Sequence, residues 1–524
     1  MQGKKKIKLC TRDGGKWRDI CEEEGMGIRL CKVEMEKLIE LFVPSCFGDA
    51  PHVRGVNLGG WLVTEGWITP ELFQGIPNGD LLDGTKIQLK SVTTGKYLSA
   101  VNGGGTNIVA NRDSASSWET FKLWRVDQNH YQFKVSSKQF WGVYSNPNVV
   151  ATVTQPSDSE TFQLIRCPQD GNRIRLRSQR TGNFVQAANE NSVTADYNGD
   201  GGCGDGNPSV FIMNHFGVLQ GEYQVTNGWG SQAKQIMQNH WNSFITEDDF
   251  VFMSQHGLNT VRVPVGWWIA YDPNPPAPFV GGSLQALDNA FNWAEKHGIR
   301  VLVDLHAAPG SQNGNAHSGT RDGSLEWGTT EQNIQDTLHV IDFLANRYRR
   351  RSGLYAIELI NEPHAPVVSQ DSLGRYYEAG YSIVRKYSNC YVIWSARIGP
   401  ADSREYLGRT NDKNGVVIDI HLYNLFSDKF KGLSPQQNID YINEQRAGNI
   451  SHVSDNSPAL SMVGEWVAVF DNQGASKEDY QRFAQAQMNV YGRATFGWCY
   501  WTFKCPPDHW SMKWMIHNGY ISVY

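Results

Sequence analysis

Eight short apolar runs recur along the chain, separated by longer stretches in which polar and apolar residues mix. This alternation is typical of buried strands linked by helices, and the stretches 330–351 and 371–387 are long enough for crossover helices. The runs are 54–58, 258–264, 299–305, 354–361, 390–395, 416–422, 459–465 and 496–501. Eight strands with helical crossovers predict an α/β fold, a (β/α)8 TIM barrel.

A second repeated pattern interrupts the barrel pattern after its first strand. Segments that alternate polar and apolar residues recur 42 to 45 residues apart, at 86–91, 131–136 and 173–178. A second set of related segments lies at 119–123, 160–164 and 209–213. Three all-β units predict an inserted β-trefoil, in which pairing among the repeats leaves few exposed edges. The predicted domains are a leader of uncertain structure at 1–50, a barrel built from 51–83 and 217–524, and an inserted trefoil at 84–216.

Charge and hydropathy exclude two classes of partner. The net charge of −5 provides no basic surface for nucleic acid, so we expect no such partner. No apolar run approaches the roughly 20 residues that span a bilayer, so we expect no membrane anchor. The basic stretch from Lys4 to Lys6 is not followed by the uninterrupted apolar core of a signal peptide. The nine cysteines lack metal-type spacing and settle neither the compartment nor a cofactor.

Three short motifs in the predicted trefoil bear on ligand binding. Asp196 to Gly201 copies the first half of a calcium loop, but Asn207 stands where a bidentate Glu belongs, which favours a glycine-rich surface loop. Glycines of the same loop match G-x-G-x-x-G without the strand and helix that a dinucleotide site needs. Gln139 to Trp141 resembles the Gln-x-Trp signature of ricin-type lectins, so contact between the trefoil and a polysaccharide stays an open expectation.

Polar and aromatic side chains collect at the ends of the predicted barrel strands, where a TIM barrel places its active site. They are Glu65 after the first strand, Arg262 in the second, His306 after the third, Asn361 and Glu362 at the fourth, His421 and Tyr423 at the sixth, Glu465 at the seventh and Trp501 at the eighth. Each alone is compatible with a structural role, but their convergence on one face indicates an active site.

Two carboxylates on opposite sides of one pocket are the groups that glycoside hydrolysis requires. One holds a proton for the leaving oxygen, and the other stays ionised to attack the anomeric carbon or to activate water. We expect Arg262 and Tyr423 to keep Glu465 ionised, and we expect that anion to raise the pKa of Glu362. The side chain of Asn361 is suited to hydrogen-bond the sugar 2-hydroxyl.

Five motifs resemble glycoside hydrolase family 5. They are Arg-Gly-Val-Asn-Leu-Gly-Gly-Trp-Leu-Val at 54–63, His-Ala-Ala-Pro-Gly-Ser-Gln-Asn-Gly at 306–314, Asn-Glu-Pro at 361–363, Gly-Glu-Trp at 464–466 and Trp-Cys-Tyr-Trp-Thr-Phe-Lys at 498–504. Within the family they look most like the exo-β-1,3-glucanase branch, and the inserted segment resembles the fascin-like trefoils of its plant members. The resemblance covers roughly 50–83 and 217–524.

The resemblance implies that Glu362 is the general acid/base and Glu465 the nucleophile of a retaining enzyme, with carboxyl groups about 5–5.5 Å apart. It also suggests secretion or a cell-wall location. The glucose contacts that it implies are Glu65, His306, Asn361, His421, Tyr423 and Trp501. Arg262 and Phe426 complete the predicted substrate-binding set. Two departures alter the rim: Asn315-Ala316-His317 replaces a Phe-Asp-Asn sequence, and Cys505-Pro506 replaces Thr-Glu.

The predicted function is that of a retaining β-glucosidase or exo-β-glucanase that acts on β-linked glucosides and short β-1,3-glucans, without metal or cofactor. A buried Glu65 near the terminal glucose would block a long chain and favour exo action. Three alternatives stay open: an endo-β-1,4-glucanase or mannanase, a transglucosylase, and a carbohydrate-binding or cytoskeletal protein with a silent barrel.

Overall fold

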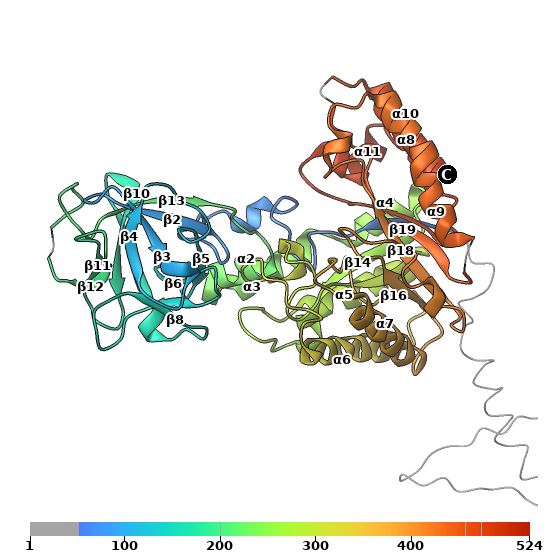
Figure 1. Ribbon diagram of the computed structural model, residues 1–524. Coiled ribbons are helices and arrows are strands. Elements are labelled where there is room, and N and C mark those ends of the chain that lie inside the picture. The colour runs from blue at the N-terminus through green and yellow to red at the C-terminus, as the bar shows by residue number, and fades with distance from the viewer. Residues whose placement is uncertain (1–51, 200, 456, 473, 524) are drawn as a thin grey trace, which may run out of the picture. The chain divides into compact units, whose positions relative to one another are not determined.

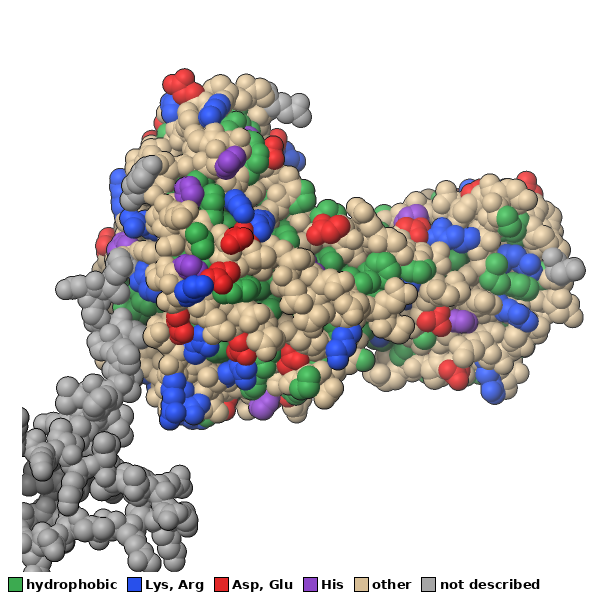
Figure 2. Space-filling view, turned by 180° about the vertical axis from the view of Figure 1, so that it is seen from behind, with side chains coloured by type: hydrophobic (Ala, Val, Ile, Leu, Met, Phe, Trp, Pro, Cys, Tyr) green, Lys and Arg blue, Asp and Glu red, His purple; other side chains and the backbone are tan. Residues whose placement is uncertain are grey.

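The computed structural model describes residues 52–199, 201–455, 457–472 and 474–523 (Figure 1). The predicted leader at 1–50 lies outside these residues. Within them, no helix is long and apolar enough to cross a membrane. On the face shown in Figure 2, acidic and basic side chains are interspersed, as expected for a chain of small net charge.

An eight-stranded parallel barrel occupies most of the described chain. Its strands, in order around the barrel, are β1 (Val53–Asn57), β14 (Thr260–Gly266), β15 (Arg300–Ala307), β16 (Leu354–Glu358), β17 (Tyr391–Ser395), β18 (Val416–Leu422), β19 (Leu460–Trp466) and β20 (Gly497–Tyr500). Strand β20 pairs with β1 and closes the barrel. Each predicted run overlaps one of these strands, so the predicted TIM barrel is confirmed.

Amphipathic helices cover the outside of the barrel, among them α5, α6 and α7 in Figure 1. In α6, Ile334, Leu338, Ile341 and Ala345 are buried at the spacing of three and four that forms one apolar face. The helix begins after Thr330, whose hydroxyl accepts the Asn333 N–H. The helices are α2 (Glu222–Trp229), α3 (Ala233–Ser243), α4 (Glu247–Gln255), α5 (Ser283–His297), α6 (Glu331–Tyr348), α7 (Gln370–Arg385), α8 (Pro435–Tyr441), α9 (Ala447–Ser454), α10 (Lys477–Tyr491) and α11 (Met512–His517).

An all-β domain lies between β1 and β14 in the chain. Six of its strands close into an antiparallel barrel: β2 (Lys86–Ser91), β5 (Phe121–Arg125), β6 (His130–Lys134), β9 (Phe162–Cys167), β10 (Asp170–Ser178) and β13 (Phe211–Phe216). Three further strand pairs extend from it: β3 (Tyr97–Ala100) with β4 (Ile108–Arg112), β7 (Phe140–Gly142) with β8 (Val150–Val153), and β11 (Phe184–Gln186) with β12 (Thr194–Tyr197). We call residues 84–216 the β domain.

The repeats seen in the sequence supply the core of the β domain. Each of the six barrel strands overlaps one repeated segment and buries two alternate side chains in a single cluster. These pairs are Ile87 and Leu89, Phe121 and Leu123, Tyr131 and Phe133, Phe162 and Leu164, Ile174 and Leu176, and Phe211 and Met213. The period of two in the sequence is therefore the alternation between core and solvent.

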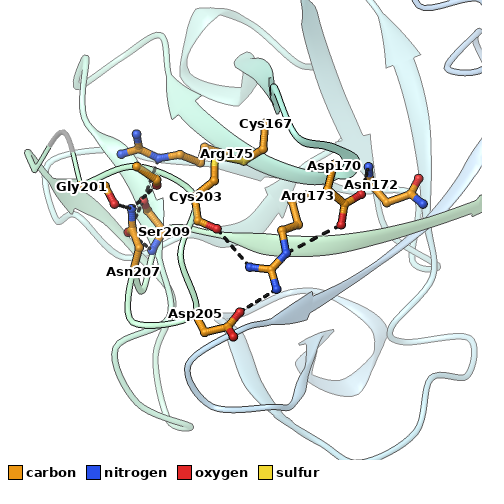
Figure 3. Close-up of a disulfide and its surroundings, with 11 residues drawn as sticks. Cys167, Asp170, Asn172, Arg173, Arg175, Gly201, Cys203, Asp205, Asn207 and Ser209 are labelled. Atoms are coloured by element: carbon orange, nitrogen blue, oxygen red, sulfur yellow. Dashed lines mark hydrogen bonds and ion pairs between the residues drawn. A yellow bond between two sulfur atoms is a disulfide. The ribbon is translucent and has the colours of Figure 1, made fainter.

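A disulfide between Cys167 and Cys203 ties β9 to the glycine-rich loop that follows β12 (Figure 3). Arg173 on the adjacent strand donates to the Cys203 carbonyl at 3.0 Å and contacts Asp205 at 2.6 Å. The Asn207 side chain donates to the carbonyls of Gly201 and Gly202 at 2.8 and 2.7 Å, and so holds the loop closed from within.

Candidate active site

A cavity of about 710 Å³ opens at the carboxyl ends of the barrel strands. Strands β15, β18 and β19 and the segments that follow β1, β16 and β20 bring side chains to it. Its lining residues are Glu65, Trp67, His306, Asn315, His317, Glu362, Ile398, His421, Tyr423, Phe426, Glu465, Trp501 and Trp510. The cavity thus combines carboxylates, imidazoles and aromatic rings, the groups that bind and cleave sugars.

Glu465 lies near the end of β19 and is almost completely buried. The Tyr423 hydroxyl donates to its Oε2 at 2.7 Å, and Arg262 Nη1 donates to its Oε1 at 3.0 Å. Burial and the nearby Glu362 carboxylate raise the pKa of Glu465, against the opposing charges of His421 and Arg262. The two expected partners of Glu465 are in place, and they limit the rise in its pKa without abolishing it.

Glu362 follows β16 in a left-handed backbone conformation, with φ of 45°. Its Oε1 lies 2.8 Å from His421 Nδ1, and its Oε2 lies 3.4 Å from His317 Nε2. Burial by itself would raise the pKa of Glu362, but the contacts with these two imidazoles hold it well below its usual range. The prediction that the neighbouring anion raises the pKa of Glu362 is therefore wrong, because His317 and His421 lie against this carboxylate and outweigh the anion.

The pKa values of both histidines are raised, in contrast to that of Glu362. His421 Nδ1 faces Glu362 and lies 3.4 Å from Glu465 Oε2, and His421 Nε2 lies 3.2 Å from Asp419 Oδ2. Burial alone would lower the pKa of His421, but these carboxylates raise it well above its usual range. Burial opposes the charging of His317 as well, but contact with Glu362 and the charge of Glu65 raise the pKa of His317 to about 9. Glu362, His317 and His421 interact so strongly that their titrations are coupled, and the two imidazoles compete with Glu362 for protons.

The two carboxylates are close together. One oxygen of Glu362, one of Glu465 and one ring nitrogen of His421 all lie within 4.8 Å of one another. Retaining glycosidases hold their carboxyl groups about 5–5.5 Å apart, whereas inverting enzymes leave about 6.5–9.5 Å for a water molecule. The nearest carboxylate oxygens therefore lie closer together than the gap that an inverting enzyme leaves for water.

Arg262 lies beneath the cavity and is completely buried. It donates to Glu358 at 2.7 Å and to the Oδ1 atom of Asn57 at 2.9 Å. It also donates to Asn361 Oδ1 at 2.8 Å, which turns the NH2 group of that amide away from the arginine. Arg262 therefore orients Asn361 and Glu465 from below, and both Arg262 and Asn361 belong to the floor rather than the lining.

Trp501 lies directly after β20 with its ring parallel to that of His306, at 5.5 Å between centroids. A glycine is needed opposite it, because a Cβ atom at Gly59 would lie 2.9 Å from the indole. This close approach accounts for the first of the paired glycines in the 54–63 motif.

Aromatic side chains form the rim. Trp67 donates its Nε1 proton to Glu65 at 2.9 Å and meets Trp510 edge-on at 5.1 Å. Phe426 has a positive φ of 57° and is 82% exposed, with Tyr423 at 5.5 Å. The rim therefore presents aromatic rings to any part of a substrate that extends out of the cavity.

Two family models match the sequence: residues 78–215 match a domain of unknown function, DUF7910, and residues 223–505 match cellulase (glycosyl hydrolase family 5). The chain belongs to glycosyl hydrolase family 5. A protein named probable glucan 1,3-beta-glucosidase A from Aspergillus clavatus is 31% identical over 354 residues, which cover 60% of this chain and 82% of the relative. A glucan 1,3-beta-glucosidase from Blumeria graminis is 30% identical over 341 residues, with 57% and 78% covered.

The crystal structure of rutinosidase from Aspergillus niger has the same fold. It superposes with a TM-score of 0.51 at 20% identity and covers 57% of this chain and 88% of that one. The barrel prediction agrees with this fold, and the family 5 assignment rests on the sequence match over residues 223–505.

The structure brings most of the predicted site residues to one cavity. Glu65, His306, Glu362, His421, Tyr423, Phe426, Glu465 and Trp501 line it. Sequence reasoning did not assign Trp67, Ile398 or Trp510 to the site, since each lies in a loop with no periodic pattern. His317 was noted only as a departure from the family sequence, and its contact with Glu362 depends on a loop conformation that the sequence does not reveal.

Proposed function

We propose that this family 5 glycoside hydrolase is a retaining exo-β-glucosidase that removes glucose from β-glucosides and short β-1,3-glucans. The observation that carries the proposal is the close pair of Glu362 and Glu465, which share His421 between them. The relatives named glucan 1,3-beta-glucosidase support the choice of glucan and linkage.

The geometry supports a double displacement. Glu465, held by Tyr423 and Arg262, attacks the anomeric carbon while Glu362 gives its proton to the leaving oxygen. The glycosidic bond breaks and an ester bond to Glu465 forms. Glu362 then takes a proton from water, whose oxygen attacks the same carbon and releases Glu465. Two inversions leave the product with its original β configuration.

Exo action is supported by Glu65, which lines the cavity, is buried and accepts the Trp67 Nε1 proton. A terminal glucose unit with free hydroxyls can hydrogen-bond to this carboxylate, and a chain that continued at this position would have to displace it. The exposed ring of Phe426 is suited to the next sugar and also to an acceptor other than water, so transglucosylation is the second candidate.

Azide can distinguish the two carboxylate roles. In Glu465→Gly, azide can occupy the vacated space and attack the sugar from the face that the carboxylate used, so an activated β-glucoside should give the α-glucosyl azide. In Glu362→Gly, azide should instead attack the glycosyl enzyme and give the β-glucosyl azide. A buried carboxylate outside the cavity, Glu222, gives the control Glu222→Gln. Azide products of the reverse configurations would refute the assigned roles.

A product profile tests exo action and linkage. With laminarioligosaccharides, glucose should appear first and the substrate should shorten by one unit at a time. Mixed oligomers at early times would favour the endo-β-1,4-glucanase or mannanase alternative, and longer products would favour transglucosylation.

We propose further that the β domain is a fascin-like β-trefoil of the plant type, able to contact polysaccharide, and that the chain divides at 51–83, 84–216 and 217–524. Its closed six-stranded barrel with three attached strand pairs supports the trefoil. Secretion to the cell wall is part of the proposal. The disulfide between Cys167 and Cys203 supports it, because such bonds persist in oxidising compartments.

A further inference from the structure

The loop between β15 and α6, residues 308–330, faces both the cavity and the β domain. Its one regular piece within the described chain is a short 3-10 helix, Ala316–Ser318, so contacts with other elements must fix its conformation. We call residues 308–330 the β15–α6 loop.

The cavity side of this loop contacts the acid/base residue. His317 Nε2 lies 3.4 Å from Glu362 Oε2, and Asn313 Nδ2 donates to the Glu362 carbonyl at 3.2 Å. The other ionisable groups that act on His317 are Glu65 and Glu465, and the His306 ring lies 5.1 Å away. The position of His317 therefore depends on the loop, and the environment of Glu362 depends on His317.

The opposite side of the loop is held by the β domain through Asp322. This carboxylate accepts the Trp124 Nε1 proton at 2.7 Å and forms an ion pair with Lys134 at 2.8 Å. The pair is shielded from solvent, with side-chain exposures of 2% for Asp322 and 11% for Lys134. Although burial opposes ionisation, these partners hold the pKa of Asp322 far below its usual range. Removing one partner of such a buried ion pair is strongly destabilising, because the other charge is left buried without a partner.

The neighbouring Arg321 adds a second contact. Its Nε donates to Asp83 at 2.8 Å, and its guanidinium lies 3.8 Å from the centre of the Trp124 ring. Lys134 Nζ lies 4.8 Å from the same ring. Two cations and one carboxylate thus converge on a single tryptophan of the β domain.

We propose that the β domain positions a residue of the active site. Trp124 and Lys134 bind Arg321 and Asp322 and so fix the β15–α6 loop. The fixed loop keeps His317 against Glu362. This inference rests on the acid/base role of Glu362 proposed above. It assigns a task to the domain of unknown function that does not require the domain to bind sugar. Trp124 and Lys134 are positioning residues, since they act through the loop and His317.

The barrel supplies a competing support for the same loop. Gln224 of α2 donates to the carbonyls of Thr320 and Arg321 at 3.0 and 2.8 Å. If this support were sufficient, the loop would keep its place without the β domain, and the test must separate the two.

The test is a double variant confined to the β domain, Trp124→Phe with Lys134→Met (the brace variant), which removes the N–H donor and the cation but keeps an aromatic ring at 124 and an unbranched apolar side chain at 134. In the full-length protein, the histidine side chains are labelled with 15N, and the signal of His317 is assigned with His317→Gln. Titration should show the pKa of His317 falling by at least about one unit, from about 9 toward the ordinary 6.5, because the imidazole no longer contacts Glu362. This readout requires no catalysis.

Activity gives a second readout. The alkaline limb of kcat/KM reports the proton that Glu362 shares with His317 and His421. Loss of the His317 contribution should move the limb to lower pH, by about one unit in the brace variant and at least as far in His317→Gln. In the His317→Gln background, the brace variant should cause no further shift, because both changes act through one contact.

Arg173→Met is the matched control, since Arg173 pairs with Asp205 inside the same domain and lies on β10. Its His317 titration and alkaline limb should equal those of the wild type, and melting curves should show all variants folded. An unchanged His317 pKa in the folded brace variant would overturn the proposal and leave Gln224 as the sufficient support. A limb shift that persists in the His317→Gln background would also overturn it. Absence of β-glucosidase activity in the wild type would instead refute the proposed function and leave the titration interpretable.

Discussion

The hydrogen bond from Tyr423 to Glu465 should set the acid limb of the pH–rate profile. The Tyr423 hydroxyl donates at 2.7 Å, and burial together with the Glu465 charge keeps the pKa of Tyr423 well above its usual range. It therefore remains a donor over the whole working pH range. Tyr423→Phe removes this donor and leaves the ring.

The expected size of the effect follows from the charge on the acceptor. A hydrogen bond to a charged group contributes about 1.5–3 kcal/mol. It stabilises only the ionised form of Glu465, so its loss raises the pKa of Glu465 by about 1–2 units. In the proposed mechanism Glu465 must be ionised to attack the sugar, and the pKa of this group in the free enzyme then sets the acid limb of kcat/KM. The limb should therefore move to higher pH by about 1–2 units.

The assay is kcat/KM for an activated β-glucoside between pH 4 and pH 9, a range of about five units around the limb. Tyr377→Phe is the control, since the buried Tyr377 hydroxyl donates to a backbone carbonyl, that of Ser395, at 2.5 Å. Its profile should keep the wild-type limbs. An unmoved acid limb in folded Tyr423→Phe would show that the hydrogen bond does not control the ionisation of Glu465, and the reasoning would fail.

Three further outcomes can be checked independently. Burial raises the pKa of Glu222 from 4.5 to about 7, so the native state holds this proton more tightly than the unfolded chain. The free energy of unfolding should therefore fall by about 3 kcal/mol between pH 4.5 and 7. Urea unfolding of Glu222→Gln should show no such loss. The disulfide spans 36 residues, so Cys167→Ser with Cys203→Ser should destabilise the β domain by about 3–4 kcal/mol in thermal unfolding. Phe426→Ala should raise KM for laminaribiose about two- to tenfold, the loss of one aromatic contact, with unfolding free energy unchanged within about 0.5 kcal/mol because the ring is exposed.

The barrel and its two carboxylates were predictable because both depend on local patterns. A strand buried on both faces is a continuous apolar run, and Glu362 and Glu465 stand at the ends of such runs. The ionisation of the site was not predictable. His317 reaches Glu362 from a loop whose path is set by contacts with distant segments, and Trp510 reaches the rim from beyond the last strand.

The contact between the β domain and the loop was equally hidden in the sequence. Arg321 and Asp322 are charged loop residues in the sequence, and the alternation with Phe121 and Leu123 places Trp124 on the face of its strand that points away from the core. Only the folded chain shows that Asp322 is buried between Trp124 and Lys134. Sequence patterns report the burial of a strand face, but they do not report which distant surface a loop meets.

The register of the β domain has a consequence for folding. Its first and last strands pair, with Lys86 opposite Phe216, so the chain enters and leaves the domain about one strand spacing apart, roughly 5 Å. Once this domain has folded, the segments 58–83 and 217–259, about 70 residues instead of about 200, separate β1 from β14, because the ends of the insertion are already paired. The entropic cost of joining the first two barrel strands is then that of the shorter loop. A large insertion beside the catalytic centre is tolerated for this reason.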